Sequence, residues 1–124
     1  MGRFDGKVAL ITGAASGIGR TTSLLLAQRG ASVIGFDIDS SALADAVGEV
    51  QANGGVMTAV VGDVSSRDDC HSAVTETVDE YGRLDLLANI AGVASSQHLT
   101  DLGKDDWDRL VGVNLTGVIW CAQA

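Results

Sequence analysis

The chain has 124 residues, of which 46% are hydrophobic, and a formal net charge of −8. This length and apolar content fit one globular domain and exclude a disordered chain, and no apolar run is long enough to cross a membrane. The acidic charge disfavours nucleic acid and anionic lipid as partners, so an anionic ligand needs a local site built from backbone dipoles. Because the sequence has two cysteines and no apolar leader, we expect no disulfide scaffold, no secretory signal and a cytoplasmic location.

Short apolar runs alternate with segments of helical periodicity along the whole chain. We expect strands over residues 7–12, 32–36, 56–61 and 84–88, helices over 17–29, 40–53, 65–81 and 104–124, and a polar loop over 92–102. Strands that alternate with helices in this way form right-handed crossovers. The pattern therefore predicts an α/β fold with a parallel sheet covered by helices on both faces.

The apolar spacing also predicts how the helices begin and which faces they bury. Ser65 is the expected N-cap of the third helix. The residues expected on the inward faces are Ile18, Thr22, Leu25 and Leu26 in the first helix and Cys70, Val74, Val78 and Tyr81 in the third. Cys70 and His71 do not form a metal-binding pattern, so we expect no metal site.

A glycine-rich turn joins the first strand to the first helix and reads Thr12-Gly13-Ala14-Ala15-Ser16-Gly17-Ile18-Gly19. Such a turn places free backbone N–H groups at the positive end of a helix, which suits a pyrophosphate. Gly13 would make the turn, Gly17 would let the phosphates approach, and Gly19 would let the helix pack against the sheet. The alternative is a tight turn that binds nothing.

Asp37 ends the second strand, 18 residues after Gly19. An acidic residue at about this distance from the glycines accepts hydrogen bonds from the adenosine ribose and repels a 2′-phosphate. Neither Ser16 nor Ile38, the neighbours that could have carried a positive charge, is basic. The spacing therefore predicts NAD rather than NADP, unless Asp37 only caps the turn at residues 39–40.

Four motifs in this order resemble the short-chain dehydrogenase/reductase family. They are the Thr-Gly-x-x-x-Gly-Ile-Gly turn, Asp63-Val64 after the third strand, Asn89-Ile90-Ala91-Gly92 after the fourth, and Val113-Asn114-Leu115-Thr116-Gly117 in the last helix. Ile90 replaces the second asparagine of the family's Asn-Asn-Ala-Gly. The resemblance spans the whole chain and implies a Rossmann-type doubly wound fold, stopping after four strands in the order 3-2-1-4. Residues 1–124 would then form a single dinucleotide-binding domain.

The resemblance also implies roles for individual residues. Asp63 would accept from the adenine amino group, and the Val64 N–H would donate to the ring. Asn89, Ala91 and Gly92 would line the ribose and nicotinamide side of the site, at the carboxyl ends of the strands. Asn114 would be the catalytic asparagine, whose backbone carbonyl holds a water of the proton relay.

Each of these polar residues also has a purely structural interpretation. Asp63 could be a turn residue at the end of its strand. Asn89 could tie neighbouring strands together, and a buried amide needs such partners in any case. Asn114 could be a polar packing group or the cause of a kink in its helix.

The residues that carry the family's proton transfer are missing from this sequence. The family uses a Ser, a Tyr, and a Lys four residues after the Tyr, because a nearby cation lowers the high pKa of a tyrosine. The one tyrosine here, Tyr81, has Asp85 four residues later, so we interpret it as a core residue. The doubly wound fold has two halves, so an intact enzyme would be about twice as long as this chain.

We therefore expect an NAD-dependent oxidoreductase that moves a hydride between nicotinamide and an alcohol or carbonyl substrate, with this chain alone inactive. The alternatives are a non-catalytic NAD- or adenine-nucleotide-binding module and an inert fragment. In the order 3-2-1-4, strand 84–88 lies at an apolar edge, which promotes association. By the resemblance, the intact form would be a homo-oligomer, either a dimer or a tetramer.

Overall fold

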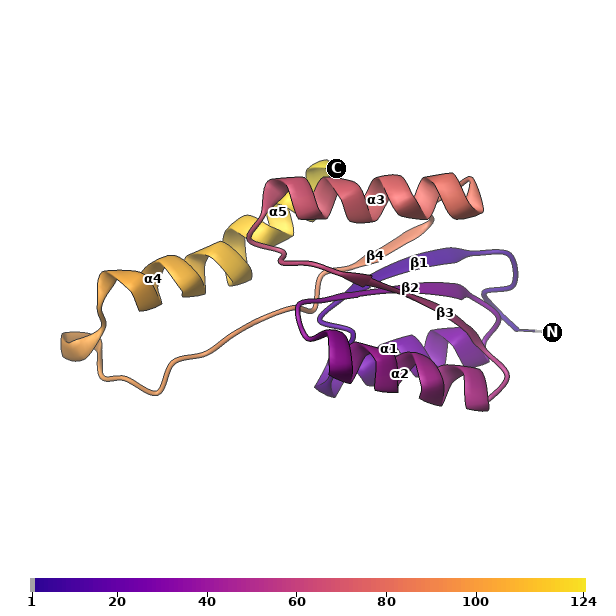
Figure 1. Ribbon diagram of the computed structural model, residues 1–124, viewed down its shortest axis with the longest axis horizontal. Coiled ribbons are helices and arrows are strands. Elements are labelled where there is room, and N and C mark those ends of the chain that lie inside the picture. The colour runs from indigo at the N-terminus through magenta and orange to yellow at the C-terminus, as the bar shows by residue number, and fades with distance from the viewer. Residues whose placement is uncertain (1) are drawn as a thin grey trace.

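The computed structural model describes residues 2–124 as a four-stranded sheet with helices on both faces (Figure 1). The strands are β1 (Val8–Thr12), β2 (Ser32–Asp37), β3 (Val56–Val61) and β4 (Leu86–Ala88). The helices are α1 (Gly17–Gln28), α2 (Ser40–Ala52), α3 (Arg67–Tyr81), α4 (Lys104–Val111) and α5 (Gly117–Gln123), with a 3₁₀ turn η1 (Leu99–Asp101) and a π-helical turn η2 (Gly112–Thr116). All strand pairs are parallel, and the order β3-β2-β1-β4 confirms the predicted topology.

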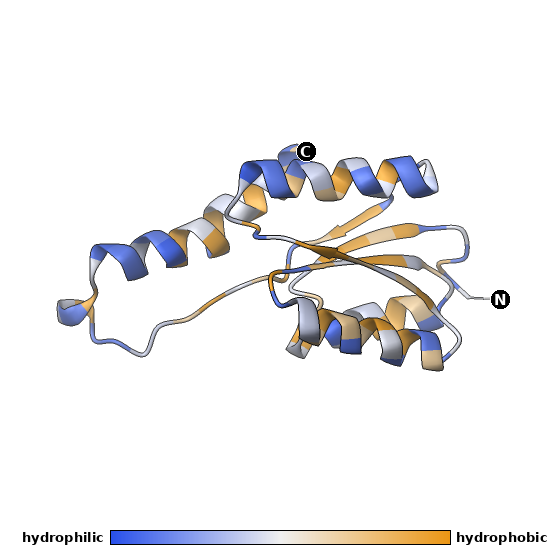
Figure 2. Cartoon of the chain, in the orientation of Figure 1, coloured by the Kyte–Doolittle hydropathy of each residue, from blue (hydrophilic) through white to orange (hydrophobic). Residues whose placement is uncertain are grey.

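The central strand β1 divides the core into two layers. Ala9 and Ile11 pack toward α1 and α2, whereas Val8 and Leu10 pack toward α3 and α5. Both sets are almost completely buried, because a strand in the middle of a parallel sheet is covered on both sides. Figure 2 shows that the strands are mostly hydrophobic and that α4 is largely hydrophilic.

Of the three apolar residues predicted to face inward in α1, only Leu26 packs against the core. In α1 the buried residues are Gly19, Ser23 and Ala27, whereas Ile18 is 75% exposed and Leu25 47% exposed. A Cβ at Gly19 would collide with the Gly13 carbonyl, so α1 approaches the sheet through its smallest residues. Close packing against the sheet therefore decides the face, not hydrophobicity.

In α3 the predicted inward face is confirmed except at Val78, because Cys70 is buried and Val74 and Tyr81 are partly buried against the core. The buried residues are Cys70, Ala73 and Thr77, and Val78 is 42% exposed. The Thr77 hydroxyl donates to the Ala73 carbonyl at 2.7 Å, which satisfies it inside the core.

Several element boundaries also differ from the prediction. The N-cap of α3 is Ser66, whose hydroxyl accepts from the Asp69 N–H, because Ser65 is bonded to Asp63 instead. The fourth strand begins at Leu86 rather than residue 84, since the Asp85 side chain accepts from the Val8 N–H at 2.9 Å. The last helix is interrupted by η2, between α4 and α5.

Candidate functional site

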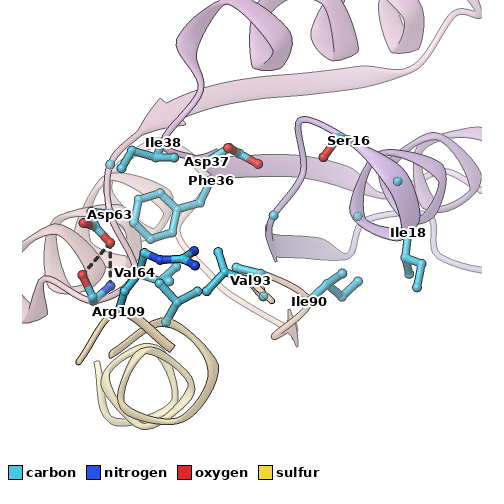
Figure 3. Close-up of a pocket in the computed structure, with 18 of the residues that line it drawn as sticks. Ser16, Ile18, Phe36, Asp37, Ile38, Asp63, Val64, Ile90, Val93 and Arg109 are labelled. Atoms are coloured by element: carbon cyan, nitrogen blue, oxygen red, sulfur yellow. Dashed lines mark hydrogen bonds between the residues drawn. The ribbon is translucent and has the colours of Figure 1, made fainter. Parts of the chain in front are cut away.

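A cavity of about 560 Å³ lies at the carboxyl ends of the strands and is lined by the start of α1, the segments that follow the four strands, α4 and η2 (Figure 3). Ligands of open α/β sheets bind at this end of the strands. The cavity is lined by Gly13, Ser16, Gly17, Ile18, Gly19, Phe36, Asp37, Ile38, Gly62, Asp63, Val64, Ser65, Ile90, Ala91, Gly92, Val93, Asp108, Arg109 and Val113. Of the predicted cofactor residues, all but Asn89 are in this lining.

The glycine turn has the backbone geometry that an anion site requires. Gly13 and Gly17 have positive φ angles of 68° and 53°, which favour glycine. A Cβ at Gly13 would also lie 2.8 Å from the Cα of Ala91, so only glycine lets the two turns meet. Ser16 is the N-cap of α1 in an extended conformation, and its side chain makes no capping hydrogen bond. The first N–H groups of α1 therefore face the cavity side of the turn with the positive end of the helix dipole.

Asp37 lies beside this turn and organises it. One carboxylate oxygen accepts from the Ala15 N–H and the other from the Asp39 N–H, both at 3.0 Å. Asp37 therefore caps the turn that begins at residue 39. Each carboxylate oxygen keeps a second lone pair, and the residue lines the cavity.

Asp63 and Val64 form the opposite end of the cavity, between β3 and α3. The Asp63 Oδ1 atom accepts from both the N–H and the hydroxyl of Ser65, at 2.9 and 2.7 Å (Figure 3). Within residues 2–124, the second carboxylate oxygen of Asp63 and the Val64 N–H have no hydrogen-bond partner. One acceptor and one donor thus stand side by side, as a heterocycle edge with an amino group and a ring nitrogen would need.

Thr12 is a structural residue of the site that sequence reasoning overlooked. Its hydroxyl oxygen accepts from the N–H groups of Ile90 and Ala91, at 2.9 and 3.0 Å, and the residue is 1% exposed. This contact fixes the turn after β4 against the glycine turn after β1. The signal was a single polar residue at the end of the apolar run of β1.

The predicted residues Asn89 and Asn114 are not among the residues that line the cavity. Asn89 follows β4 but does not line the cavity. Asn114 lies in η2, where its amide accepts from the Val93 N–H and donates to the Val93 carbonyl, both at 2.8 Å. The side chain of Asn114 therefore holds the loop after β4, and its backbone belongs to the π-helical turn.

Tyr81 lies at the end of α3 that points away from the cavity. Its hydroxyl is 3.1 Å from the Thr58 hydroxyl, and its ring packs against the α3 and α5 side of the core. This position agrees with the interpretation of Tyr81 as a core residue. Within residues 2–124, no cluster of three or more histidine, cysteine, aspartate or glutamate side chains could hold a metal ion, and no helix is long and apolar enough to span a bilayer.

The sequence profile of the short chain dehydrogenase family matches residues 7–124. The chain therefore belongs to the short-chain dehydrogenase family, which confirms the resemblance seen in the four motifs. Its predicted doubly wound fold is confirmed as well, by solved structures of the same family.

Individual relatives match the chain closely over about half of their own length. The chain is 45% identical to a 3-oxoacyl-[acyl-carrier-protein] reductase, FabG, of Thermotoga maritima, covering 98% of this chain and 49% of the relative. It is 40% identical to the (2S)-[(R)-hydroxy(phenyl)methyl]succinyl-CoA dehydrogenase subunit BbsD of Thauera aromatica, with the same coverage. A short chain dehydrogenase/reductase from Burkholderia phymatum, solved in complex with NAD, superposes with a TM-score of 0.94 at 36% identity, covering 99% of this chain and 44% of that one.

Proposed function

We propose that the chain forms the cofactor-binding part of an NAD-dependent oxidoreductase that moves a hydride between nicotinamide and an alcohol or carbonyl substrate. The observation that carries this proposal is the convergence of three groups on one cavity: the glycine turn, the Asp37 carboxylate and the Asp63–Val64 pair. Family membership and the NAD complex of a related structure support it.

Different residues of the cavity contact different parts of the dinucleotide. The free N–H groups at the start of α1 hold the pyrophosphate. Asp37 accepts from the adenosine ribose, and Asp63 with the Val64 N–H contacts the adenine edge. Ala91, which donates to the Thr12 hydroxyl, and its neighbour Gly92 line the path toward the nicotinamide. The bound nicotinamide supplies the hydride donor or acceptor.

The charge of the cavity favours NAD over NADP. Asp37 faces the position of the adenosine ribose, so a 2′-phosphate would meet a carboxylate there. Ser16 and Ile38 also line the cavity and supply no positive charge to offset it. Repulsion between like charges at such short range is large compared with thermal energy.

A calorimetric titration of the chain with NAD and with NADP tests the proposal. NAD is expected to bind at least tenfold more tightly, and Asp37→Ala is expected to narrow that difference by weakening NAD and strengthening NADP. Asp45→Ala removes the same charge from an exposed position of α2 outside the cavity and serves as the control. Equal or tighter binding of NADP by the parent chain would rule out the assignment.

A second candidate is an adenine-nucleotide-binding module without catalysis. It is favoured by one observation: the tyrosine of this chain is bonded to Thr58, away from the cavity, and is followed by Asp85 rather than by a lysine four residues later. Both candidates require nucleotide binding and differ in turnover.

A further inference from the structure

Arg109 brings a positive charge into a cavity that is otherwise acidic. Its side chain extends from α4 into the space between Asp63 and Val93 (Figure 3). The carboxylates of Asp37, Asp63 and Asp108 line the same cavity. In a chain of net charge −8, a cation at this position calls for a physical explanation.

The contacts of Arg109 orient its guanidinium but involve only some of its hydrogen-bond donors. One terminal nitrogen, Nη2, donates to the Ala94 carbonyl at 3.2 Å, and Nε lies 3.7 Å from an oxygen of Asp106. The second oxygen of Asp106 accepts from the Ser95 hydroxyl at 3.3 Å, which ties the same loop to α4. A guanidinium has five N–H donors and two flat faces, so these contacts leave most of the group free.

The position of Arg109 along the cavity indicates whether its guanidinium would contact the phosphates or the base of a bound nucleotide. The start of α1, where a pyrophosphate would bind, carries Ser16 and Ile18 at one end of the view in Figure 3, and Arg109 lies toward the other end, beside Asp63 and Val64. The latter end is where the donor and acceptor of the Asp63–Val64 pair meet a heterocycle. Arg109 therefore lies on the side of the base rather than of the phosphates.

We propose that the Arg109 guanidinium stacks on the adenine ring of the bound nucleotide and is a specificity residue for the base. The inference rests on the proposed function. A planar cation is attracted to the face of an aromatic ring, and arginine stacks where lysine does not. Ile38 is 68% exposed at the end of β2 and lines the same cavity, so it supplies an apolar wall for the ring. Val64 and Val113 extend that wall.

Binding of nucleotide fragments to Arg109→Met tests this role. Methionine keeps most of the length of the side chain but removes the charge and the plane. We expect the affinity for AMP and for uncharged adenosine to fall by the same factor, about 3- to 30-fold, while the affinity for nicotinamide mononucleotide stays unchanged. In Arg109→Lys, less than half of the decrease in the logarithm of the affinity is expected to be recovered. Lysine restores the positive charge but has no planar group that could stack on the ring.

Arg29→Met is the matched control, since Arg29 is exposed at the C-terminal end of α1, away from the cavity. A loss for AMP with no loss for adenosine would overturn the proposal, because it would assign Arg109 to the phosphate. Unchanged affinities in Arg109→Met, or equal losses for adenosine and nicotinamide mononucleotide, would overturn it as well. If the parent chain binds neither AMP nor ADP-ribose, the proposed function fails together with this inference. Circular dichroism of each variant verifies that the fold is retained.

Discussion

Thr12 is the polar residue at the end of an otherwise apolar strand, and its hydroxyl organises a turn on the neighbouring strand. The two N–H groups that it accepts, from Ile90 and Ala91, belong to a turn that lines the cavity. A threonine at this position therefore couples the shape of the site to the stability of the sheet.

Thr12→Val tests this coupling because valine has the same shape without the hydroxyl. Two part-buried N–H groups lose their acceptor, which is expected to lower the free energy of unfolding by about 1–3 kcal/mol. Thr12→Ser keeps the acceptor and is expected to lose less. Urea unfolding at neutral pH measures both variants, and a Thr12→Val chain as stable as the parent would contradict the role.

At the residue scale, the sequence could predict which side chains meet at the cavity but not which hydrogen bonds they make there. Asp37 was found from its spacing, yet its bonds to the Ala15 and Asp39 N–H groups depend on the fold of the turn. Arg109 gave no signal in the sequence, because a charged residue on a helix is most often solvated. Its place in the cavity follows from the path of the loop after β4, which sequence patterns do not determine.

At the scale of elements, α3 and α5 are joined by a pair of buried thiols. The sulfur atoms of Cys70 and Cys121 lie 3.4 Å apart, and the Cys70 thiol donates to the Val64 carbonyl at 3.2 Å. Burial raises the pKa of Cys70 to about 12 and also raises the pKa of Cys121. Both cysteines are therefore neutral packing groups at physiological pH.

These raised pKa values make the stability of the chain fall at alkaline pH. In the unfolded chain the thiols ionise near pH 9, whereas in the folded chain Cys70 stays protonated to about pH 12. The unfolded state thus releases protons first, and the free energy of unfolding is expected to fall as the pH rises from 9 toward 12, by up to about 1.4 kcal/mol per pH unit for each thiol. Urea unfolding between pH 8 and about pH 11 measures the slope.

The double variant Cys70→Ala, Cys121→Ala is the comparison for this slope. It is expected to be less stable at pH 7, since it removes buried sulfur atoms, but to show a shallower decline above pH 9. A parent and a double variant with parallel pH profiles would contradict the assignment of the decline to the two thiols.

The π-helical turn η2 is the second connection at this scale, and Asn114 links it to the loop after β4. Asn114→Ala removes both hydrogen bonds to Val93, so amide hydrogen exchange is expected to accelerate at least tenfold over residues 92–98. Asn53→Ala removes a side-chain hydrogen bond at the end of α2 and is expected to leave these residues unchanged. Unaltered exchange in Asn114→Ala would show that the loop is held by the Arg109 and Ser95 contacts alone.

The order and direction of the elements could be predicted from the sequence, whereas the buried face of α1 could not. A continuous apolar run such as that of β1 predicts a strand that is buried on both faces of the sheet. The face of α1 depends instead on how closely the helix approaches the sheet, so Gly19, Ser23 and Ala27 are buried and the larger Ile18 is not. In the sequence, Asn114 was the one residue that indicated the interruption of the last helix.

At the scale of the whole molecule, exposed apolar surface includes residues of the last helical segment, and one edge of the sheet is the short strand β4. β4 pairs with β1 and lies at the edge of the sheet, and Leu115 and Ile119 are 58% and 50% exposed on η2 and α5. Exposed sheet edges and apolar patches promote association. The chain spans about half the length of the curated relatives that it matches.

We predict that the chain alone self-associates through this surface. Sedimentation velocity is expected to show concentration-dependent oligomers, and the double variant Leu115→Lys, Ile119→Lys is expected to shift the distribution toward the monomer. Because both side chains are exposed, the charged residues should change the free energy of unfolding by less than about 0.5 kcal/mol. A strictly monomeric parent chain over the whole concentration range would contradict the prediction.

The last prediction concerns turnover, which separates the two candidate functions. Hydride transfer from an alcohol requires a base for the hydroxyl proton, and a tyrosine serves only where a nearby cation lowers its pKa. The tyrosine of this chain is bonded to Thr58 far from the glycine turn, and Asp85 is an anion. We therefore expect the 124-residue chain to bind NAD but to form no NADH from secondary alcohols, measured by absorbance with ethanol-free buffer as the blank. NADH formation that is lost in Asn114→Ala would show that a complete site exists without these groups.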